Sequence, residues 1–381
     1  MKLKITKKNK NFLTAVSVIV GTIVGVGFLG IPYVAAKSGF FVTMFHLIIL
    51  GSLILIINLS FGEIILRTKG QRHITGYAYK YLGKKGKDTM FILFNLAIIS
   101  ALLAYMIGVG ESLSYLFFGN LDYFIPIGAL FGFVMSYFLW GGVSSLRKFE
   151  KLGVITIIFF VILIASFYSG DIDYTNFFGF DKAYFFLPFG VILFSLMEFF
   201  TFPTVRKILR GNEQLMKKAI ITGTIIPILF YMFFALIVVG FAGSKTPEIS
   251  TIAFGPLFII LGIITMFTSY LGLGTALERS YMLDYREKKK KAWFKSTILP
   301  IALFLIIGFF EFLTFTRVLS IGGVFAGGLI GMMVLAIHRK ANTQGNRIPE
   351  YKVYISKITA ILIIFVIIVG VITEIWSLIF K

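Results

Sequence analysis

The sequence contains no cysteine, only three histidines and few charged residues for its length. Without cysteine the chain can form no disulfide, and it has no thiolate to bind zinc or act as a nucleophile. Charged residues make up 14% of the 381 residues and hydrophobic residues 58%, whereas soluble domains carry about 25% and about 45–50%. This composition excludes a water-soluble globule and, with 44 phenylalanines, a disordered chain. It indicates an all-α membrane protein.

Long stretches without charge divide the sequence. Eight of them reach or approach the ~18–20 residues that a helix needs to cross about 30 Å of hydrocarbon. They are 11–36, 38–62, 89–110, 123–146, 152–170, 219–244, 249–277 and 318–338. Three further stretches contain one carboxylate each, namely 183–205, 296–316 and 358–380. The sequence therefore predicts eleven membrane-spanning helices in a single transmembrane domain over residues 1–381.

The basic residues are distributed unevenly between the connections of these spans. Every second connection, starting with the N-terminus, is basic, and these segments hold 32 of the 37 lysines and arginines. Basic loops stay on the cytoplasmic side of a membrane. We therefore expect a multi-pass protein of the plasma membrane with a cytoplasmic N-terminus and an extracellular C-terminus. The net charge of +20 then comes from basic cytoplasmic segments that orient the protein and contact anionic lipid. No nucleic-acid partner is expected.

Two spans carry helix-breaking residues. The first contains four glycines and Pro32 within residues 21–32, and the sixth contains Pro188, Gly190 and Pro203. These spans lie five apart, so an odd number of helices per half makes the halves run in opposite directions. The sequence predicts a 5+5 inverted repeat, with residues 1–170 and 183–338 as the halves and 357–380 as an extra helix 11. Broken helices at matching positions point to a substrate site at the midplane.

An unwound segment between half-helices offers amide donors at one helix end and carbonyl acceptors at the other. A zwitterionic amino acid presents both charges that suit this pair. We expect the amides of Gly25, Val26 and Gly27 to meet a carboxylate. The carbonyls expected to meet the ammonium are those of Ile23, Phe194, Ser195 and Leu196. The alternative is that the glycines only allow close helix packing, which we expect for Gly323 and Gly327 in the tenth span.

Four motifs carry a resemblance to known transporters. Residues 25–29 (GVGFL) with Ile31-Pro32 resemble the first helix of the amino acid/auxin permeases and the hydroxy/aromatic amino acid permeases, both in the amino acid–polyamine–organocation superfamily. Residues 194–197 (FSLM), 76–84 (GYAYKYLGK) and 268–274 (TSYLGLG) are similar to the sixth helix, 2–3 loop and eighth helix of these families. The resemblance implies a LeuT-type fold with discontinuous helices 1 and 6, alternating access and ion-coupled amino acid uptake.

The resemblance also suggests where a coupling ion binds. Thr268 and Ser269 match the position at which sodium-coupled relatives place hydroxyls, facing the carbonyls of Gly21 and Val24. The alternative is that these hydroxyls bond only to the preceding turn of their own helix. The fifth span lacks the lysine that some proton-coupled relatives carry there, which favours Na⁺ over H⁺. No cofactor and no further metal are expected.

Three side chains near the breaks are further candidates for substrate contact. Tyr105 could close over the substrate or simply pack, and Phe199 follows the second break. Glu198 stands where the family commonly has glycine, and a carboxylate at membrane depth is unfavourable unless it is neutralised or paired. It could carry a proton, meet a cationic part of the substrate, or have a structural role.

The sequence shows no arrangement of residues typical of an enzyme active site. There is no Ser/His/Asp set, and His46, His73 and His338 lack metal-ligand spacing. Glu63 lies near basic residues, so an ordinary ion pair is expected. The sequence therefore predicts a secondary active transporter of amino acids and not an enzyme. A non-transporting sensor or a channel-like protein on the same fold is the alternative. The expected partners are the substrate and the lipid bilayer, with no obligatory protein partner.

Overall fold

The computed structural model describes residues 7–25, 27–141, 159, 162–197, 199–309 and 314–380, and within them the regular structure is helical. Short 3₁₀ turns connect several helices, among them η5 (Gly243–Lys245) and η6 (Ser250–Phe254). The helices are α1 (Lys7–Ile23), α2 (Gly27–Ser38), α3 (Phe40–Arg67), α4 (Ile74–Phe118), α5 (Phe124–Trp140), α7 (Leu187–Leu196), α8 (Phe202–Ile208), α9 (Met216–Ala242), α10 (Pro256–Asp284), α11 (Lys289–Phe309), α12 (Phe315–Ile321), the π-helical η7 (Gly322–Gly328), α13 (Leu329–Gln344) and α14 (Lys357–Phe380).

Seven helices in the described part of the chain are long and apolar enough to cross a membrane. The pair α1 and α2 would be an eighth span, bent by 54° at its break. Two shorter apolar helical segments are Phe124–Trp140 and Lys182–Leu196. About half of the predicted span 152–170 lies outside the described residues, so the count of eleven stays a prediction.

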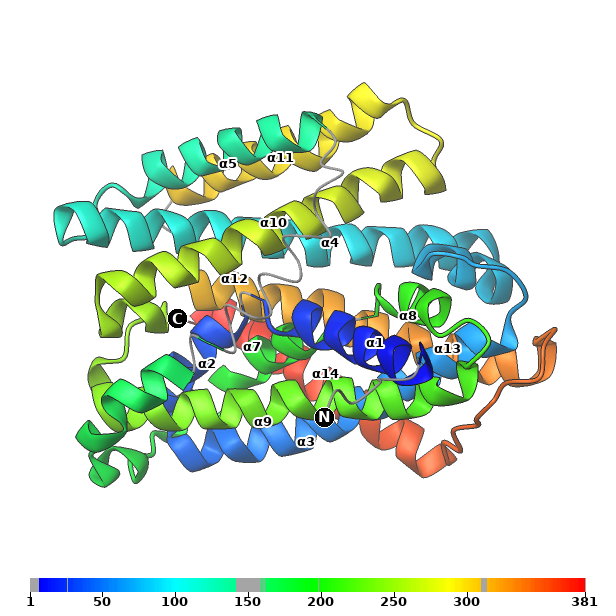
Figure 1. Ribbon diagram of the computed structural model, residues 1–381, viewed down its shortest axis with the longest axis horizontal. Helices are drawn as coiled ribbons and strands as arrows, with labels where there is room; N and C mark the ends of the chain where they lie inside the picture. Colours follow the sequence, from blue (N-terminus) through cyan, green and yellow to red (C-terminus); the bar gives the residue numbers. More distant parts are fainter. Residues whose placement is uncertain are drawn as a thin grey trace.

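The helices run between two ends of an elongated bundle (Figure 1). The start of α1, the end of α3 and the start of α4 lie at one end, on the right of the figure, together with the turn from α10 to α11. The basic segments 67–88, 206–218, 279–295 and 339–357 all belong to this end, which we call the basic end. Helix α14 finishes at the opposite end (Figure 1). These four basic connections thus share one end, as the charge pattern predicts.

Two groups of helices pack side by side. Helices α4, α5, α10 and α11 form one group, and α1, α2, α3, α7 and α9 form the other (Figure 1). The groups are connected by α12, η7 and α13, each of which packs both against α4 and against a helix of the second group, α7 or α3. Helix α14 lies on the outside, where Phe365 and Trp376 are 61% and 64% exposed. Apolar side chains exposed along a helix of this length suit contact with lipid.

Helix α4 contains a bend at Gly83, whose φ of 74° separates residues 74–82 from the long remainder. A positive φ is open to glycine without the clash that a Cβ would cause. The amphipathic stretch 74–82 therefore forms a short helical arm of its own at the basic end.

The glycine-rich π-helix η7 packs directly on α7. A methyl group added at Gly323 would lie 2.7 Å from the backbone N of Phe194, and one added at Gly327 would overlap the side chain of Met197. Both glycines therefore allow close approach of two helices, in agreement with the packing expected for them. Because Met197 is the C-cap of α7, the contact of Gly327 with Met197 packs η7 directly against the second helix break.

Candidate functional site

The first break lies between α1 and α2. Helix α1 ends at Ile23 and α2 begins at Gly27, while Val24 and Gly25 are non-helical and Val26 lies outside the described residues. The amide of Gly25 donates to the carbonyl of Ile23 at 2.8 Å. The interruption thus falls among the glycines. Pro32, in contrast, lies within α2 and does not end it.

The second break follows α7. Helix α7 ends at Leu196, and Met197 is extended with a ψ of 122°. Pro188 and Pro203 stand in the first turns of α7 and α8, where proline is tolerated because its missing N–H would have no partner there. Phe199 is fully buried, whereas Glu198 lies outside the described residues.

The two breaks lie against each other. A methyl group added at Gly27 would be 2.7 Å from Ser195 Cα and would also overlap its side chain. A methyl group added at Gly25 would lie 3.3 Å from the hydroxyl of Tyr105 on α4. The structure therefore brings together the glycines of the first break, the last turn of α7 and Tyr105, which is 2% exposed.

Tyr231 on α9 joins both breaks. Its hydroxyl donates to Ile23 O at 2.6 Å and to Ser195 O at 3.0 Å. The side chain is completely buried. Sequence reasoning did not select Tyr231. The sequence feature that could have indicated it is a tyrosine in the middle of the neutral stretch 219–244, because a buried hydroxyl needs a hydrogen-bond partner.

Most of the carbonyls predicted to bind an ammonium already accept hydrogen bonds in this conformation. Ile23 O accepts from Gly25 N as well as from Tyr231, and Phe194 O accepts from Met197 N at 3.3 Å. Ser195 O accepts from Tyr231. A substrate ammonium would therefore have to share or replace these donors, and the Gly25 amide would have to leave Ile23 O before it could meet a carboxylate.

The predicted cation site involves residues on α10 and α1. Thr268 and Ser269 lie in the middle of α10, both half-buried, and Thr268 Oγ1 donates to Thr265 O at 2.9 Å. Such a bond to the preceding turn is the local alternative to ion binding. Tyr270 of α10 has its ring centre 6.2 Å from that of Tyr105, the residue whose hydroxyl lies near Gly25. Gly21 lies in the last turn of α1, on the N-terminal side of the break. The assembly of these residues around one ion stays a prediction.

Within the described residues, no group of three or more histidine, aspartate or glutamate side chains could hold a metal ion. Among the described residues, the breaks offer backbone amides, backbone carbonyls and the hydroxyls of Tyr105, Ser195 and Tyr231.

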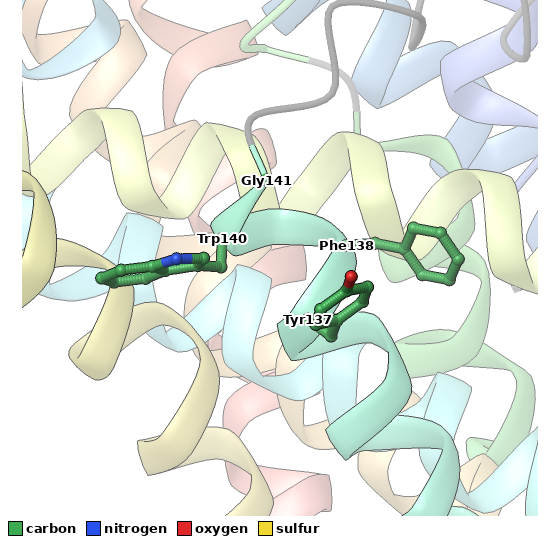
Figure 2. Close-up of a pocket in the computed structure, with 4 residues that line it drawn as sticks. All are labelled: Tyr137, Phe138, Trp140 and Gly141. Carbon is green, nitrogen blue, oxygen red and sulfur yellow. The ribbon is translucent and has the colours of Figure 1, made fainter.

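A pocket also opens at the C-terminal end of α5 (Figure 2). It is lined by Tyr137, Phe138, Trp140 and Gly141, and the three rings point in different directions from the last turn of the helix. These residues include no charged side chain and none of the predicted site residues. The described residues that line the pocket therefore offer no paired charges for a zwitterion, and the helix breaks remain the candidate site.

Comparison with known proteins places this geometry in context. A profile described as the tryptophan/tyrosine permease family matches residues 8–253. The tyrosine-specific transport system 1 of Haemophilus influenzae is 27% identical over 229 residues, which cover 57% of this chain and 55% of the relative. The amino acid transporter AVT1H of Arabidopsis thaliana is 28% identical over 180 residues, 45% of this chain and 42% of the relative.

A third relative is matched over more of its length. The glutamine transporter 2 of Aliivibrio fischeri is 26% identical over 284 residues, which cover 68% of this chain and 72% of the relative. The chain thus spans about half the length of the first two relatives. All three matched proteins are named as transporters of amino acids or of one amino acid.

Proposed function

The chain belongs to the tryptophan/tyrosine permease family, and we propose that it takes up amino acids across the plasma membrane by ion-coupled alternating access. The matched relatives are transporters, so the chain is a multi-pass membrane protein of amino acid transport and not an enzyme. The substrate is a small amino acid zwitterion. Tyrosine and glutamine, the amino acids in the names of two relatives, are the first candidates.

The proposed architecture is a LeuT-type 5+5 inverted repeat, with residues 1–170 and 183–338 as the repeats and α14 as helix 11. Two observations support it. The breaks after Ile23 and Leu196 fall in the first spans of the two proposed halves. In addition, α1 and α2 run away from the basic end, whereas α7 and α8 run toward it (Figure 1). Opposite directions of the two broken spans are what an inverted repeat requires.

The contact between the two breaks carries the functional proposal. Gly27 approaches the backbone of Ser195 closely enough to exclude a methyl group, and Tyr231 bridges carbonyls on both sides. Non-helical backbone at this depth is tolerated where it is buried in protein or lines a cavity. We assign the carboxylate to the amides of residues 25–27 and the ammonium to the carbonyls of Ile23 and residues 194–196. Tyr105, whose hydroxyl lies near Gly25, and Phe199, which follows the second break in the sequence, are both buried side chains.

The coupling ion is proposed to bind residues of α10 and α1 or, if it is a proton, Glu198. Na⁺ would bind the hydroxyls of Thr268 and Ser269 and the carbonyls of Gly21 and Val24. H⁺ would instead be carried by Glu198, which directly follows the cap of α7 in the sequence. The basic end faces the cytoplasm in this proposal, as positive segments generally do.

The decisive experiment is uptake into proteoliposomes. Purified protein is reconstituted, and entry of radiolabelled L-tyrosine and L-glutamine is measured with a Na⁺ gradient or a pH gradient imposed separately. Accumulation against the amino acid gradient that follows one ion gradient supports the proposal, with protein-free liposomes as the control. Saturable binding without uptake would indicate a sensor, and rapid flux that neither gradient drives would indicate a channel.

A further inference from the structure

Tyr231 lies at an electrostatically unusual point. The carbonyls that it contacts belong to Ile23, the last residue of α1, and to Ser195, in the last turn of α7. The last carbonyls of a helix have no partner within the helix, and the helix dipole places about half a negative charge at that end. Two half-helices therefore direct their negative ends toward one phenolic hydroxyl.

The hydroxyl has one proton for two acceptors. Its oxygen lies 2.6 Å from Ile23 O and 3.0 Å from Ser195 O, so a single O–H is shared between carbonyls 208 and 36 residues away in the sequence. Each carbonyl oxygen has two lone pairs, so both can also accept from a group with several N–H donors. An ammonium has three such donors and a positive charge that both dipole ends favour.

The position of the phenol is fixed by its own helix. Helix α9 packs against α1, α2 and α7. Beside Tyr231, the rings of Phe230 and Phe234 make edge-to-face contacts with Phe28 of α2, with ring centres 5.8 and 5.2 Å apart. Edge-to-face pairs add to the burial energy of the rings. This aromatic contact anchors α9 on the first break and keeps the hydroxyl of Tyr231 between the two half-helices.

We propose that Tyr231 is the positioning residue of an ammonium subsite, a role that rests on the proposed amino acid transport. Its hydroxyl holds the carbonyls of Ile23 and Ser195 toward one point, so that a primary ammonium finds both acceptors already oriented. Acceptors held in place before binding reduce the entropy that the ligand loses on binding. Tyr231 thereby gives the site its preference for ligands with a free ammonium over those without one.

The test compares ligands with and without an ammonium. L-tyrosine is paired with 3-(4-hydroxyphenyl)propanoate, and L-glutamine with its des-amino analogue glutaramate. Dissociation constants are measured on the purified full chain. The quantity compared is the affinity for the amino acid divided by the affinity for its des-amino analogue. In Tyr231→Phe this ratio should fall about tenfold, the usual effect of losing the orientation of a bond to a charged group. A merely structural role would lower both affinities together.

A matched control separates this effect from the loss of any buried phenol. Tyr351→Phe also removes a buried tyrosine hydroxyl that donates to a helix carbonyl, Leu59 O at 2.8 Å, and it should leave the ratio unchanged. Tyr231→Met, which removes the hydroxyl but keeps a long apolar side chain, provides the same measurement if the phenylalanine variant does not fold. An unchanged or larger ratio in the Tyr231 variant that folds overturns the inference.

Failure of the proposed function gives a different result. Wild-type protein that binds neither amino acid would overturn the transport proposal and the ammonium subsite with it. Wild-type protein that transports either amino acid and prefers it over its des-amino analogue, with the same preference in Tyr231→Phe, would overturn the role of Tyr231 alone.

Discussion

The carboxylate of Glu63 on α3 and the imidazole of His338 on α13 meet at the basic end, with Oε2 and Nε2 2.9 Å apart. The same Oε2 accepts from the backbone N of Val353 at 2.6 Å, and Oε1 accepts from Arg67 Nε at 2.6 Å. Glu63 is fully buried and His338 is 3% exposed. One carboxylate therefore connects α3, α13 and the segment before α14. Removing one member of such a buried set leaves the others without compensation.

Glu63→Gln should destabilise the protein by about 3 kcal/mol, because it removes the charge that compensates Arg67 and supports two further donors. Thermal unfolding of the purified protein in detergent should show a melting temperature lowered by about 5 °C. The control is Glu350→Gln, which breaks the surface pair with Arg347 and should change stability by less than about 1 kcal/mol. Equal stability of the two variants would contradict this account.

Gly27→Ala should reduce uptake to about a tenth or less, since the added methyl would overlap Ser195 and force the two breaks apart. Initial uptake rates in proteoliposomes measure the effect. Adding Ser195→Gly removes the overlapping side chain and should restore part of the activity. Gly272→Ala is the matched control, because a methyl group there meets nothing within 4 Å. Normal uptake by Gly27→Ala would argue against a site at the contact between the breaks.

Thr268→Ala and Ser269→Ala should each raise the Na⁺ concentration for half-maximal uptake about tenfold, the effect of losing one bond to a charged group. Uptake is measured over a Na⁺ titration at fixed pH. Thr275→Ala serves as control, since Thr275 also bonds to the preceding turn of α10, at Leu271 O. If wild-type uptake ignores Na⁺ and follows a pH gradient, the sodium site is rejected.

Glu198→Gln addresses the carboxylate that the sequence places after the cap of α7 and that lies outside the described residues. If Glu198 carries the coupling proton, uptake in the variant should lose its dependence on the pH gradient. If Glu198 meets a cationic substrate group, affinity for lysine should fall while affinity for glutamine persists. Glu350→Gln is the control, because it makes the same substitution at a surface position. If the uptake rate, its pH profile and the substrate preference are all unchanged, only a structural role remains for Glu198.

Cysteine labelling tests the orientation of the bundle, and the chain has no native cysteine to interfere. Lys290→Cys at the basic end should react in intact cells only with a membrane-permeant maleimide. Tyr174→Cys, at an exposed position in the connection before α7, should react with an impermeant one. Labelling of both positions by the impermeant reagent in sealed cells would contradict the charge-based orientation.

The amino-acid sequence by itself determined the features that arise from neighbouring residues. Neutral stretches predicted where the helices form, the glycines of residues 21–30 predicted the first break, and basic connections predicted one shared end. The motifs also predicted the permease family. These signals are local, because helix formation, helix breaking and membrane partition depend on a residue and its neighbours in the chain. Residues 152–158 of the predicted fifth span lie outside the described part, whereas residues 162–168 of that span are helical, as the sequence predicts.

Only the tertiary structure decided which residues meet. An ion pair of Glu63 with a nearby basic residue was expected, and Arg67, four residues away, forms it, whereas His338 joins that carboxylate from 275 residues away. Likewise, the glycines predicted a break but not that Gly27 packs on Ser195 or that Tyr231 reaches both half-helices. Such contacts depend on how distant helices pack. The sequence around a buried hydroxyl does not indicate which carbonyl will accept its hydrogen bond. The partner of a buried polar group is set by the fold, because burial requires a partner without specifying which one.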